Sequence, residues 1–302
     1  MPSARAESPT PAHRELVVLS LVVVLCLVWG STWWGIRLCL EGQPPLCSAA
    51  MRFSIASLLM LLLSPMLRRL ENAPPPPRWL WITSGLTNFA GSYGIIYVVE
   101  QHLPSGIAAV LWSIFPLLIA GSAVLFLGER LRPRQALGFA VSFAGIVTVS
   151  SGDLGGGDAE IGSALLLLTS PVLSAIGTTL LKKYGSGTSS VLLNRNGMML
   201  GAVLLASAAL VRENPATIVW TTNGVLALLY LAAFGTALTF GIYFWLLRTA
   251  PASLMATISF VTPVLAMLLS AAVGDGVIGA GDWAGAGLVA LGVALVVVRA
   301  KR

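Results

Sequence analysis

Charged side chains are scarce in this chain of 302 residues, since Asp, Glu, Lys and Arg together make up only 10%. A typical soluble domain is about 25% charged, so the chain lacks the charges that the surface of a soluble protein of this size needs. Apolar residues make up 56%, which excludes an intrinsically disordered chain. The composition therefore indicates an all-α polytopic membrane protein.

Cysteine is also rare. Cys26, Cys39 and Cys47 are too few for a disulfide framework. Cys39 and Cys47 flank one short loop and would pair only in an oxidising space, so free, buried thiols are the preferred interpretation. No metal-ligand motif, phosphate loop or nucleophile constellation occurs. The sequence therefore predicts no enzyme, no bound metal and no other cofactor.

Long apolar runs are abundant instead. They cover about residues 16–40, 46–67, 79–100, 104–127, 133–150, 161–182, 190–211, 222–247, 251–273 and 282–299. A bilayer-spanning helix needs roughly 20 apolar residues, so we predict ten transmembrane helices. The first run is too long for a signal-peptide core, and we expect it to be retained.

The basic residues predict the orientation. Of the 18 lysines and arginines, Arg52 and Arg195 lie within predicted helices, and Arg37 and Arg212 lie in loops on one side. The other 14 lie on the side of the two termini, and cytoplasmic loops are rich in Lys and Arg. We therefore expect both termini to be cytoplasmic. The net charge of +6 follows from this asymmetry, and no nucleic-acid partner is predicted.

The two halves of the chain match at a shift of 147 residues. The coincidences are Gly30 with Gly177, Thr32 with Thr179, Gly94 with Gly241, Pro104 with Pro251, Ala109 with Ala256, Pro116 with Pro263, Gly138 with Gly285, and Gly145 with Gly292. Five helices per half would place the second half upside down, an arrangement typical of secondary transporters. We predict a tail of residues 1–15, repeats over 16–150 and 161–299, an outer loop over 151–160 and a cytoplasmic end at 300–302.

Several motifs carry a family resemblance. They are Trp29-Gly30-Ser31-Thr32, Pro44-Pro45 followed by Met51-Arg52-Phe53, Pro104-Ser105-Gly106-Ile107-Ala108-Ala109, Pro116 and Leu127-Gly128-Glu129-Arg130. Over residues 16–299 the chain resembles the EamA-type branch of the drug/metabolite transporter superfamily. In the second half Gly274-Asp275-Gly276 stands where the Gly-Glu-Arg motif would recur, so a role that needs this Glu twice is not expected.

The resemblance implies a secondary transporter that moves a small organic metabolite or drug, such as an amino-acid-like solute, across the cell membrane by alternating access. It also implies export, and a bacterial inner membrane as the location. A membrane enzyme and a regulatory membrane subunit are the alternatives. The expected partners are the solute and the lipid bilayer, and a homodimer is left open.

Two arginines inside predicted helices need an explanation, because a charge at the centre of a spanning helix costs roughly 2.5–3.5 kcal/mol on insertion scales. Arg52 and Arg195 occupy matching places in the second helix of each half, at a shift of 143. Either they face a central cavity and attract a carboxylate or phosphate, or each of them reaches the membrane interface or bonds to backbone carbonyls and so anchors its helix. Asn194, beside Arg195, makes that helix locally polar.

Glu100 and His102 end the third predicted helix. A carboxylate in a partly dry setting and an imidazole that titrates near neutrality are both able to exchange protons. They are the candidates for proton coupling, and a solvated helix end is the alternative.

Other polar and aromatic residues inside helices are candidate solute contacts. They are Trp29, Thr32, Asn88, Tyr93, Tyr97, Trp112, Tyr243 and Ser259, and helix–helix contact is the alternative for each. Pro116 and Pro263 lie mid-helix at matched positions, where a missing backbone hydrogen bond kinks a helix. Such a matched pair of kinks would shape both gates of a central cavity, and plain packing around a bend is the alternative.

Overall fold

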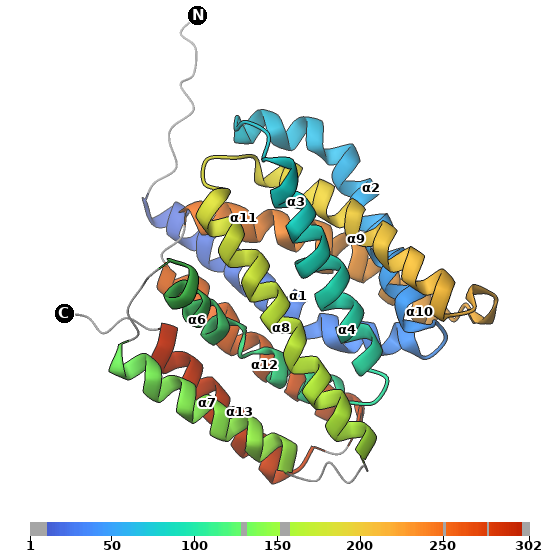
Figure 1. Cartoon of the computed structure of the whole chain (residues 1–302), viewed down its shortest axis with the longest axis vertical. Helices are drawn as coiled ribbons and strands as arrows, with labels where there is room; N and C mark the ends of the chain where they lie inside the picture. Colours follow the sequence, from blue (N-terminus) through green and yellow to red (C-terminus); the bar gives the residue numbers. More distant parts are fainter. Residues whose placement is uncertain (1–10, 128–131, 152–157, 250–251, 277, 298–302) are drawn as a thin grey trace, which may run out of the picture.

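The computed structural model describes residues 11–127, 132–151, 158–249, 252–276 and 278–297. Within these residues every regular element is a helix, and the helices form one bundle (Figure 1). Six are long and apolar enough to cross a bilayer: Leu16–Leu40, Pro45–Glu71, Ser105–Ser122, Glu160–Tyr184, Ser190–Arg212 and Thr222–Tyr243. Val261–Val273 and Ala280–Leu295 are shorter apolar helices. The chain is therefore a multi-pass helical membrane protein.

The described elements form ten units when consecutive helices are joined. They are α1 (Pro11–Leu40), α2 (Pro45–Glu71), α3 (Arg78–Ser84) with η1 (Gly85–Gly91) and α4 (Ser92–Val99), α5 (Ser105–Trp112) with α6 (Phe115–Leu127), α7 (Pro133–Ser151), α8 (Asp158–Tyr184), α9 (Ser190–Arg212), α10 (Thr222–Ala232) with η3 (Ala233–Leu238) and α11 (Thr239–Thr249), α12 (Ala252–Val273) and α13 (Ala280–Val297). A 3-10 turn, η2 (Pro215–Thr217), precedes α10. These units coincide with the ten predicted runs to within a few residues.

Local chemistry sets the helix ends. Pro45 occupies the first turn of α2, where its missing N–H costs nothing because that position has no intrahelical acceptor. The side chains of Ser189 and Thr221 accept hydrogen bonds from the backbone N–H groups of Leu192 and Gly224, and so cap α9 and α10. Such caps satisfy donors that the helix itself leaves unpaired.

Two units are interrupted by π-helix at matching places. The segments η1 and η3 lie between α3 and α4 and between α10 and α11. The last residues of the two segments, Gly91 and Leu238, are 147 positions apart in the sequence. A π-turn widens the helix and frees backbone carbonyls, and it often marks a functional site.

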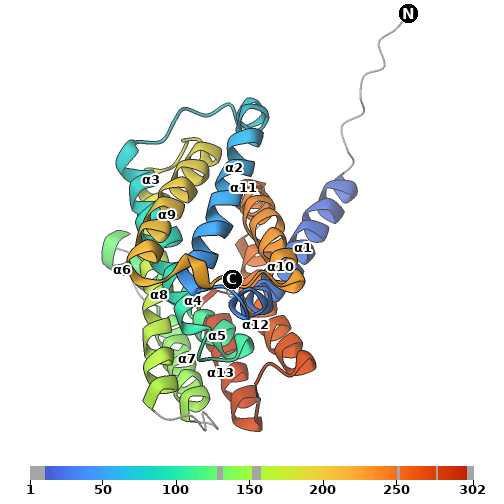
Figure 2. The same cartoon turned by 90° about the vertical axis from the view of Figure 1, so that its right-hand side faces the viewer.

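Helix pairs at opposite edges of the bundle hold the two halves of the chain together. The helix α2 packs along α9 at one edge, and α7 packs along α13 at the other (Figures 1 and 2). Between them α1 packs on α12, and α6 packs on α8. Each of these pairs joins a helix from the first 151 residues to one from the remainder, so the bundle interior is shared by both halves.

Glycines bring α7 and α13 into backbone contact. A Cβ atom on Gly145 would lie 2.7 Å from both the Gly285 carbonyl oxygen and the Val289 backbone nitrogen. A Cβ on Gly292 would lie 2.5 Å from the Gly138 carbonyl oxygen. Between these contacts the Ser142 hydroxyl donates to the Val289 carbonyl oxygen at 3.2 Å. Small residues permit this close approach in a membrane, where packing drives helix association.

Two glutamates cap the helices α2 and α9 reciprocally. Glu213, which follows α9, accepts hydrogen bonds from the backbone N–H groups of Leu46 and Cys47, both at 2.8 Å. Glu71, which ends α2, accepts one from the N–H of Ser190 at 2.7 Å. A carboxylate at a helix N-terminus is favoured by the unpaired N–H groups and by the helix dipole. The antiparallel pair is thus fastened at both ends.

The outer surface of the bundle carries large apolar side chains. Leu62, Leu125, Phe143 and Val211 are all more than 60% exposed, as expected for side chains that face lipid. The amino-terminal part of α1 stands apart from its neighbours (Figure 2), and Leu16 and Leu19 on it are exposed. All three cysteines are free and buried, which confirms the preferred interpretation of the sequence.

Candidate functional site

Arg52 lies on the buried face of α2, and its side chain is only 1% exposed. Its Nε donates to Thr236 Oγ1 at 2.9 Å, its Nη1 to the Tyr97 hydroxyl at 3.4 Å, and its Nη2 to the Gly235 carbonyl oxygen at 3.4 Å. Arg52 is therefore buried between helices, and its hydrogen bond to the Gly235 carbonyl oxygen is the kind of contact expected of an arginine that anchors its helix. The spacing of Arg52 from Ala49 and Ala56, which are fully buried, places all three on one helix face.

The π-helical segment η3 builds the acceptor site for Arg52. Thr236 Oγ1 also donates to the Leu231 carbonyl oxygen, five residues earlier, at 2.8 Å, so its lone pair is directed at the guanidinium. Gly235 adds a backbone carbonyl from the same segment. Arg52 therefore joins the first half of the chain, through α2, to the irregular turn of the second half.

Arg52 keeps an unbalanced charge. Among the described residues, no carboxylate oxygen lies within 4.0 Å of its guanidinium nitrogens. The ion pair found in the described part of the chain joins Arg37 to Asp275 and does not include Arg52. The guanidinium carbon lies 4.9 Å from the ring centroid of Tyr93 and 5.7 Å from that of Phe53. Ring faces attract a cation, and they offset part of the cost of burying it without supplying a negative charge.

Aromatic rings continue from Arg52 across the bundle. We call this series the aromatic row, and its members are Tyr93, Phe53, Phe89, Phe240, Trp29 and Tyr243. Successive ring centroids lie 4.9, 5.5, 5.6, 6.1 and 5.3 Å apart, within the range of favourable ring contacts. The rings come from α1, α2, η1, α4 and α11, so both halves of the chain contribute.

Glu100 and His102 lie in different environments. Glu100 is fully buried, whereas His102 is exposed in the turn after α4. The expectation of a solvated helix end is therefore wrong for Glu100. Tyr93, Tyr97 and Glu100 are spaced four and three residues apart, which puts them on one helix face. That spacing gives the shared face, but it does not by itself show whether the face meets protein, lipid or water.

A network of polar contacts lies beside Glu100 and joins α1, α5 and the residues that follow α4 and α12. Arg37 on α1 donates from Nη1 to the Glu100 carbonyl oxygen at 2.7 Å, and its Nε lies 3.2 Å from Asp275 Oδ1. Asp275 Oδ2 accepts from the backbone N–H of Ser105 at 2.9 Å. The aspartate that replaces the Gly-Glu-Arg motif thus caps α5. The Gly128-Glu129-Arg130 motif itself lies outside the described residues.

Arg195 is placed differently from Arg52. It is half-buried, its Nε donates to Asn196 Oδ1 at 3.1 Å, and its Nη1 donates to Ser64 Oγ at 3.3 Å, near the carboxyl end of α2. At a shift of 147 the position equivalent to Thr236 holds Phe89, which offers no acceptor. The two arginines therefore have unequal environments, although their sequence positions match.

The remaining candidates lie at several places in the bundle. Asn88 in η1 accepts from the Thr178 hydroxyl at 3.4 Å, and the Trp112 indole N–H donates to Ser170 Oγ at 3.1 Å. The Thr32 hydroxyl donates to the carbonyl oxygen of Trp29 at 2.8 Å. Asn194 is buried on α9, and Ser259 is half-buried on α12.

The two matched prolines have different consequences. Pro116 is the second residue of α6, directly after the break that separates α5 from α6. Pro263 lies inside the continuous helix α12. The break beside Pro116 agrees with the expected loss of a backbone hydrogen bond, and the two proline sites are not structural copies of each other.

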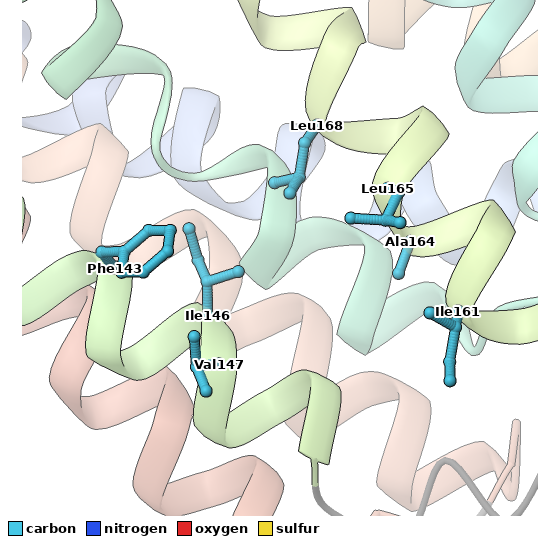
Figure 3. Close-up of a pocket in the computed structure, with 7 residues that line it drawn as sticks. All are labelled: Phe143, Ile146, Val147, Ile161, Ala164, Leu165 and Leu168. Atoms are coloured by element: carbon cyan, nitrogen blue, oxygen red, sulfur yellow. The ribbon is translucent and has the colours of Figure 1, made fainter.

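An apolar groove lies apart from Arg52, between α7 and α8 (Figure 3). Phe143, Ile146 and Val147 line it from α7, and Ile161, Ala164, Leu165 and Leu168 line it from α8. Phe143 and Leu165 are more than 60% exposed. No lining residue carries a polar side chain, so the groove suits contact with lipid chains. No group of three metal-ligating side chains occurs in the described part of the chain.

Comparison with known proteins decides the family. The sequence pattern of the EamA-like transporter family matches the chain twice, over residues 16–151 and 161–298. The chain belongs to the EamA-like transporter family. This confirms the resemblance inferred from the sequence motifs, and the chain is a membrane transporter by family.

Individual relatives agree with this assignment. The chain is 32% identical over 293 residues to "Uncharacterized inner membrane transporter YedA" of Escherichia coli K12, covering 94% of this chain and 92% of the relative. It is 29% identical to "Uncharacterized transporter YvbV" of Bacillus subtilis, covering 86% and 84%. A solved crystal structure has the same fold, with a TM-score of 0.67 at 18% identity, covering 93% of this chain and 96% of the other.

Several residues of the site were not predicted. Gly235, Phe89 and Phe240 carry no local signal of a site, because apolar rings and single glycines are common in any membrane helix, and Phe53 and Asp275 stand out only as motif residues without an expected contact. Their roles depend on partners far away in the sequence, such as Arg52 and Gly235, which are 183 residues apart.

Proposed function

We propose that this protein is a secondary transporter that moves a small organic solute by alternating access, with the solute bound between the two halves beside Arg52 and the aromatic row. The direction of net flux that we propose is export, as the family resemblance implies. The single observation that carries the proposal is a buried guanidinium without a carboxylate partner among the described residues, at the contact between α2 and η3.

Reciprocal contacts support an inverted repeat. In space, Gly145 contacts Gly285 and Gly138 contacts Gly292. In the sequence match at a shift of 147 residues, Gly138 instead corresponds to Gly285 and Gly145 to Gly292. Such exchanged partners are what a two-fold axis produces, because residue i then contacts the copy of j while j contacts the copy of i. The Ser142–Val289 hydrogen bond, between residues 147 apart, would lie close to this axis.

The capping glutamates support the same symmetry at the other edge. Glu71 caps α9 and Glu213 caps α2, so each helix of the pair ends in the carboxylate that caps the other. Two structurally similar halves with such contacts would be able to exchange conformations and expose one central site to either side. Arg52 contacts the opposite half through Thr236, so movement of the halves would change its partners.

The chemistry of the site favours a solute with a carboxylate and an apolar or aromatic body. A buried Arg recognises a planar carboxylate through paired N–H donors, and the aromatic row offers ring faces beside it. An amino-acid-like solute satisfies both requirements. A membrane enzyme would need a cluster of acidic, histidine or serine groups at one depth, which the described site does not present.

Flux measurements test this proposal. The purified protein is reconstituted in proteoliposomes, and uptake of radiolabelled amino acids and aromatic carboxylates is compared with that of protein-free vesicles. We expect saturable, protein-dependent flux, and we expect Arg52→Gln to lower the flux at least about tenfold, the effect of about 1.4 kcal/mol of lost binding. Arg195→Gln is the comparison variant, and its effect should be smaller because Arg195 does not contact the aromatic row.

The membrane orientation belongs to the same proposal. We infer that both termini face the cytoplasm, and tags at each end should be accessible to a protease only after the cells are opened. Accessibility of one tag alone in intact cells would contradict an even number of spans. Absence of saturable flux for every solute tested, with folded protein in the vesicles, would favour a regulatory membrane subunit instead.

A further inference from the structure

The carboxyl group of Glu100 is buried without any partner. Both of its oxygens are shielded from solvent, and neither accepts nor donates a hydrogen bond within the described residues. Only the backbone of Glu100 is engaged: its N–H donates to the Ile96 carbonyl oxygen at 2.9 Å, and its carbonyl oxygen accepts from Arg37 at 2.7 Å. An ionised carboxylate in such a place is costly, because buried charges require a counter-charge and hydrogen bonds. The neutral, protonated acid fits this environment better.

Three charged groups interact electrostatically with Glu100. Arg37 on α1, Arg52 on α2 and Asp275 after α12 all lie close enough to interact with it electrostatically. Arg37 and Asp275 already balance each other as an ion pair at 3.2 Å. Arg52 is the remaining cation, and its guanidinium lies beyond ion-pair distance from the Glu100 carboxylate. The other titratable groups on the same helix face are Tyr97, which bonds to Arg52, and Tyr93, whose ring lies beside it, and the Cys39 thiol of α1 also interacts with Glu100.

We propose that Glu100 is the proton-binding residue of the transport cycle, and that its carboxylate and the carboxylate of the solute balance the positive charge of Arg52 in turn. This inference rests on the proposed function. When Glu100 is ionised, its charge balances Arg52 and the site rejects an anion. When Glu100 is protonated, Arg52 needs an external negative charge, and the solute carboxylate supplies it.

The two loading states have the same net charge. One holds ionised Glu100 with Arg52, and the other holds protonated Glu100, Arg52 and the bound carboxylate. The only covalent change is the O–H bond of Glu100, whose proton comes from water on the side that the site faces and leaves on the other side. A proton and a solute anion therefore move together, and export of the solute requires an outward solute gradient.

His102 and Asp275 do not fit this role. His102 is exposed in the turn after α4, outside the buried environment of Arg52. Asp275 already pairs with Arg37 and caps α5, and protonating it would break both contacts. Glu100 is a buried carboxyl group that changes its charge without breaking an existing hydrogen bond of its side chain, whereas the buried Asp282 accepts one from the Gly279 N–H.

Binding-linked proton uptake tests the inference directly. The purified protein in weakly buffered detergent solution is mixed with phenylacetate, which carries one carboxylate on an aromatic body, and a pH dye reports the protons bound. Calorimetry gives the amount of phenylacetate bound. For the wild type above neutral pH we expect about one proton per bound anion, and an affinity that falls about tenfold per pH unit, as linkage of one proton requires.

Two variants give the comparison. Glu100→Gln resembles the protonated acid, so it should bind phenylacetate with no proton uptake and with an affinity that is constant over the same pH range. His102→Gln removes an exposed titratable group two residues away and should behave as the wild type. Phenylacetamide, the neutral amide of the probe, should cause no proton uptake with any of the three proteins.

Each other outcome overturns the inference. Phenylacetate binding by the wild type without proton uptake would show an anion site that is uncoupled from Glu100, and uptake that persists in Glu100→Gln would assign the proton elsewhere. Absence of phenylacetate binding to the wild type overturns the inference as well. Where Glu100→Gln does not elute as a monodisperse peak, infrared spectra of the wild type replace it. The inference is supported by a protonated-carboxyl band that disappears at high pH and that persists to higher pH when phenylacetate is bound. Absence of this band overturns the inference.

These outcomes are separate from a failure of the proposed function. Saturable flux in proteoliposomes tests transport itself and needs no proton measurement. A protein that transports solute but takes up no proton on binding would keep the proposed function and lose the coupling role of Glu100. A protein that takes up protons with phenylacetate but shows no flux would lose the proposed function and keep the proton binding by Glu100.

Discussion

Substitution of Gly285 by alanine tests the backbone contact between α7 and α13. A Cβ at this position would lie 2.5 Å from Val149 Cγ2, 2.8 Å from the Gly145 carbonyl oxygen and 2.9 Å from the Val149 backbone nitrogen. Two of these atoms belong to the backbone, so no rotamer change relieves the overlap, and the helices must separate. Overpacking of this kind costs about 1–3 kcal/mol, and the rigid neighbours place Gly285 in the upper part of that range.

Gly287 on the same helix is the matched control. It is exposed, and a Cβ there would meet no atom within 4 Å. Alanine is about 1 kcal/mol better than glycine in a helix interior, and this gain applies to both substitutions. The difference in stability between Gly285→Ala and Gly287→Ala is therefore the packing cost alone, about 2–3 kcal/mol.

The assay is thermal unfolding of the detergent-purified variants, followed by the loss of the monodisperse peak in size-exclusion chromatography. We expect Gly285→Ala to lose the peak at a lower temperature than the wild type, and Gly287→Ala at the same or a higher temperature. Equal midpoints for the two alanine variants would refute the reasoning, because the helix-propensity gain is common to both and only the contact differs.

Two further substitutions probe the polar contacts at the helix ends. Glu213→Gln removes the charge that caps α2 through Leu46 and Cys47, and we expect a loss of about 1–3 kcal/mol of stability, measured by the same thermal assay, whereas Glu41→Gln on an exposed side chain should have no effect. Asp275→Asn and Arg37→Gln break one ion pair, so the double variant should be destabilised by less than the sum of the single variants, and additive midpoints would contradict a direct interaction.

The polar residues of the site were only partly predictable, and Glu100 shows why. Its spacing from Tyr97 places it on the same helix face, yet nothing local says whether that face meets lipid, water or protein. Lipid tails are as apolar as the side chains of a protein interior, so the apolar pattern of a membrane helix does not distinguish its buried face as it does in water. The burial of Glu100 follows only from tertiary contacts at the end of α4, where Arg37 of α1 bonds to its carbonyl oxygen and pairs with Asp275.

The sequence by itself determined the ten helices, the positions of their ends and the duplication of the chain. These features depend on local composition, on prolines and glycines that restrict the backbone, and on a repeat that is visible at a fixed shift. Only the tertiary structure decided that Arg52 is buried against η3, that Arg195 has a different environment, and that Asp275, Glu71 and Glu213 cap helices from other parts of the chain. Those contacts join residues more than 100 positions apart, and their partners are set by how helices pack rather than by the order of residues along them.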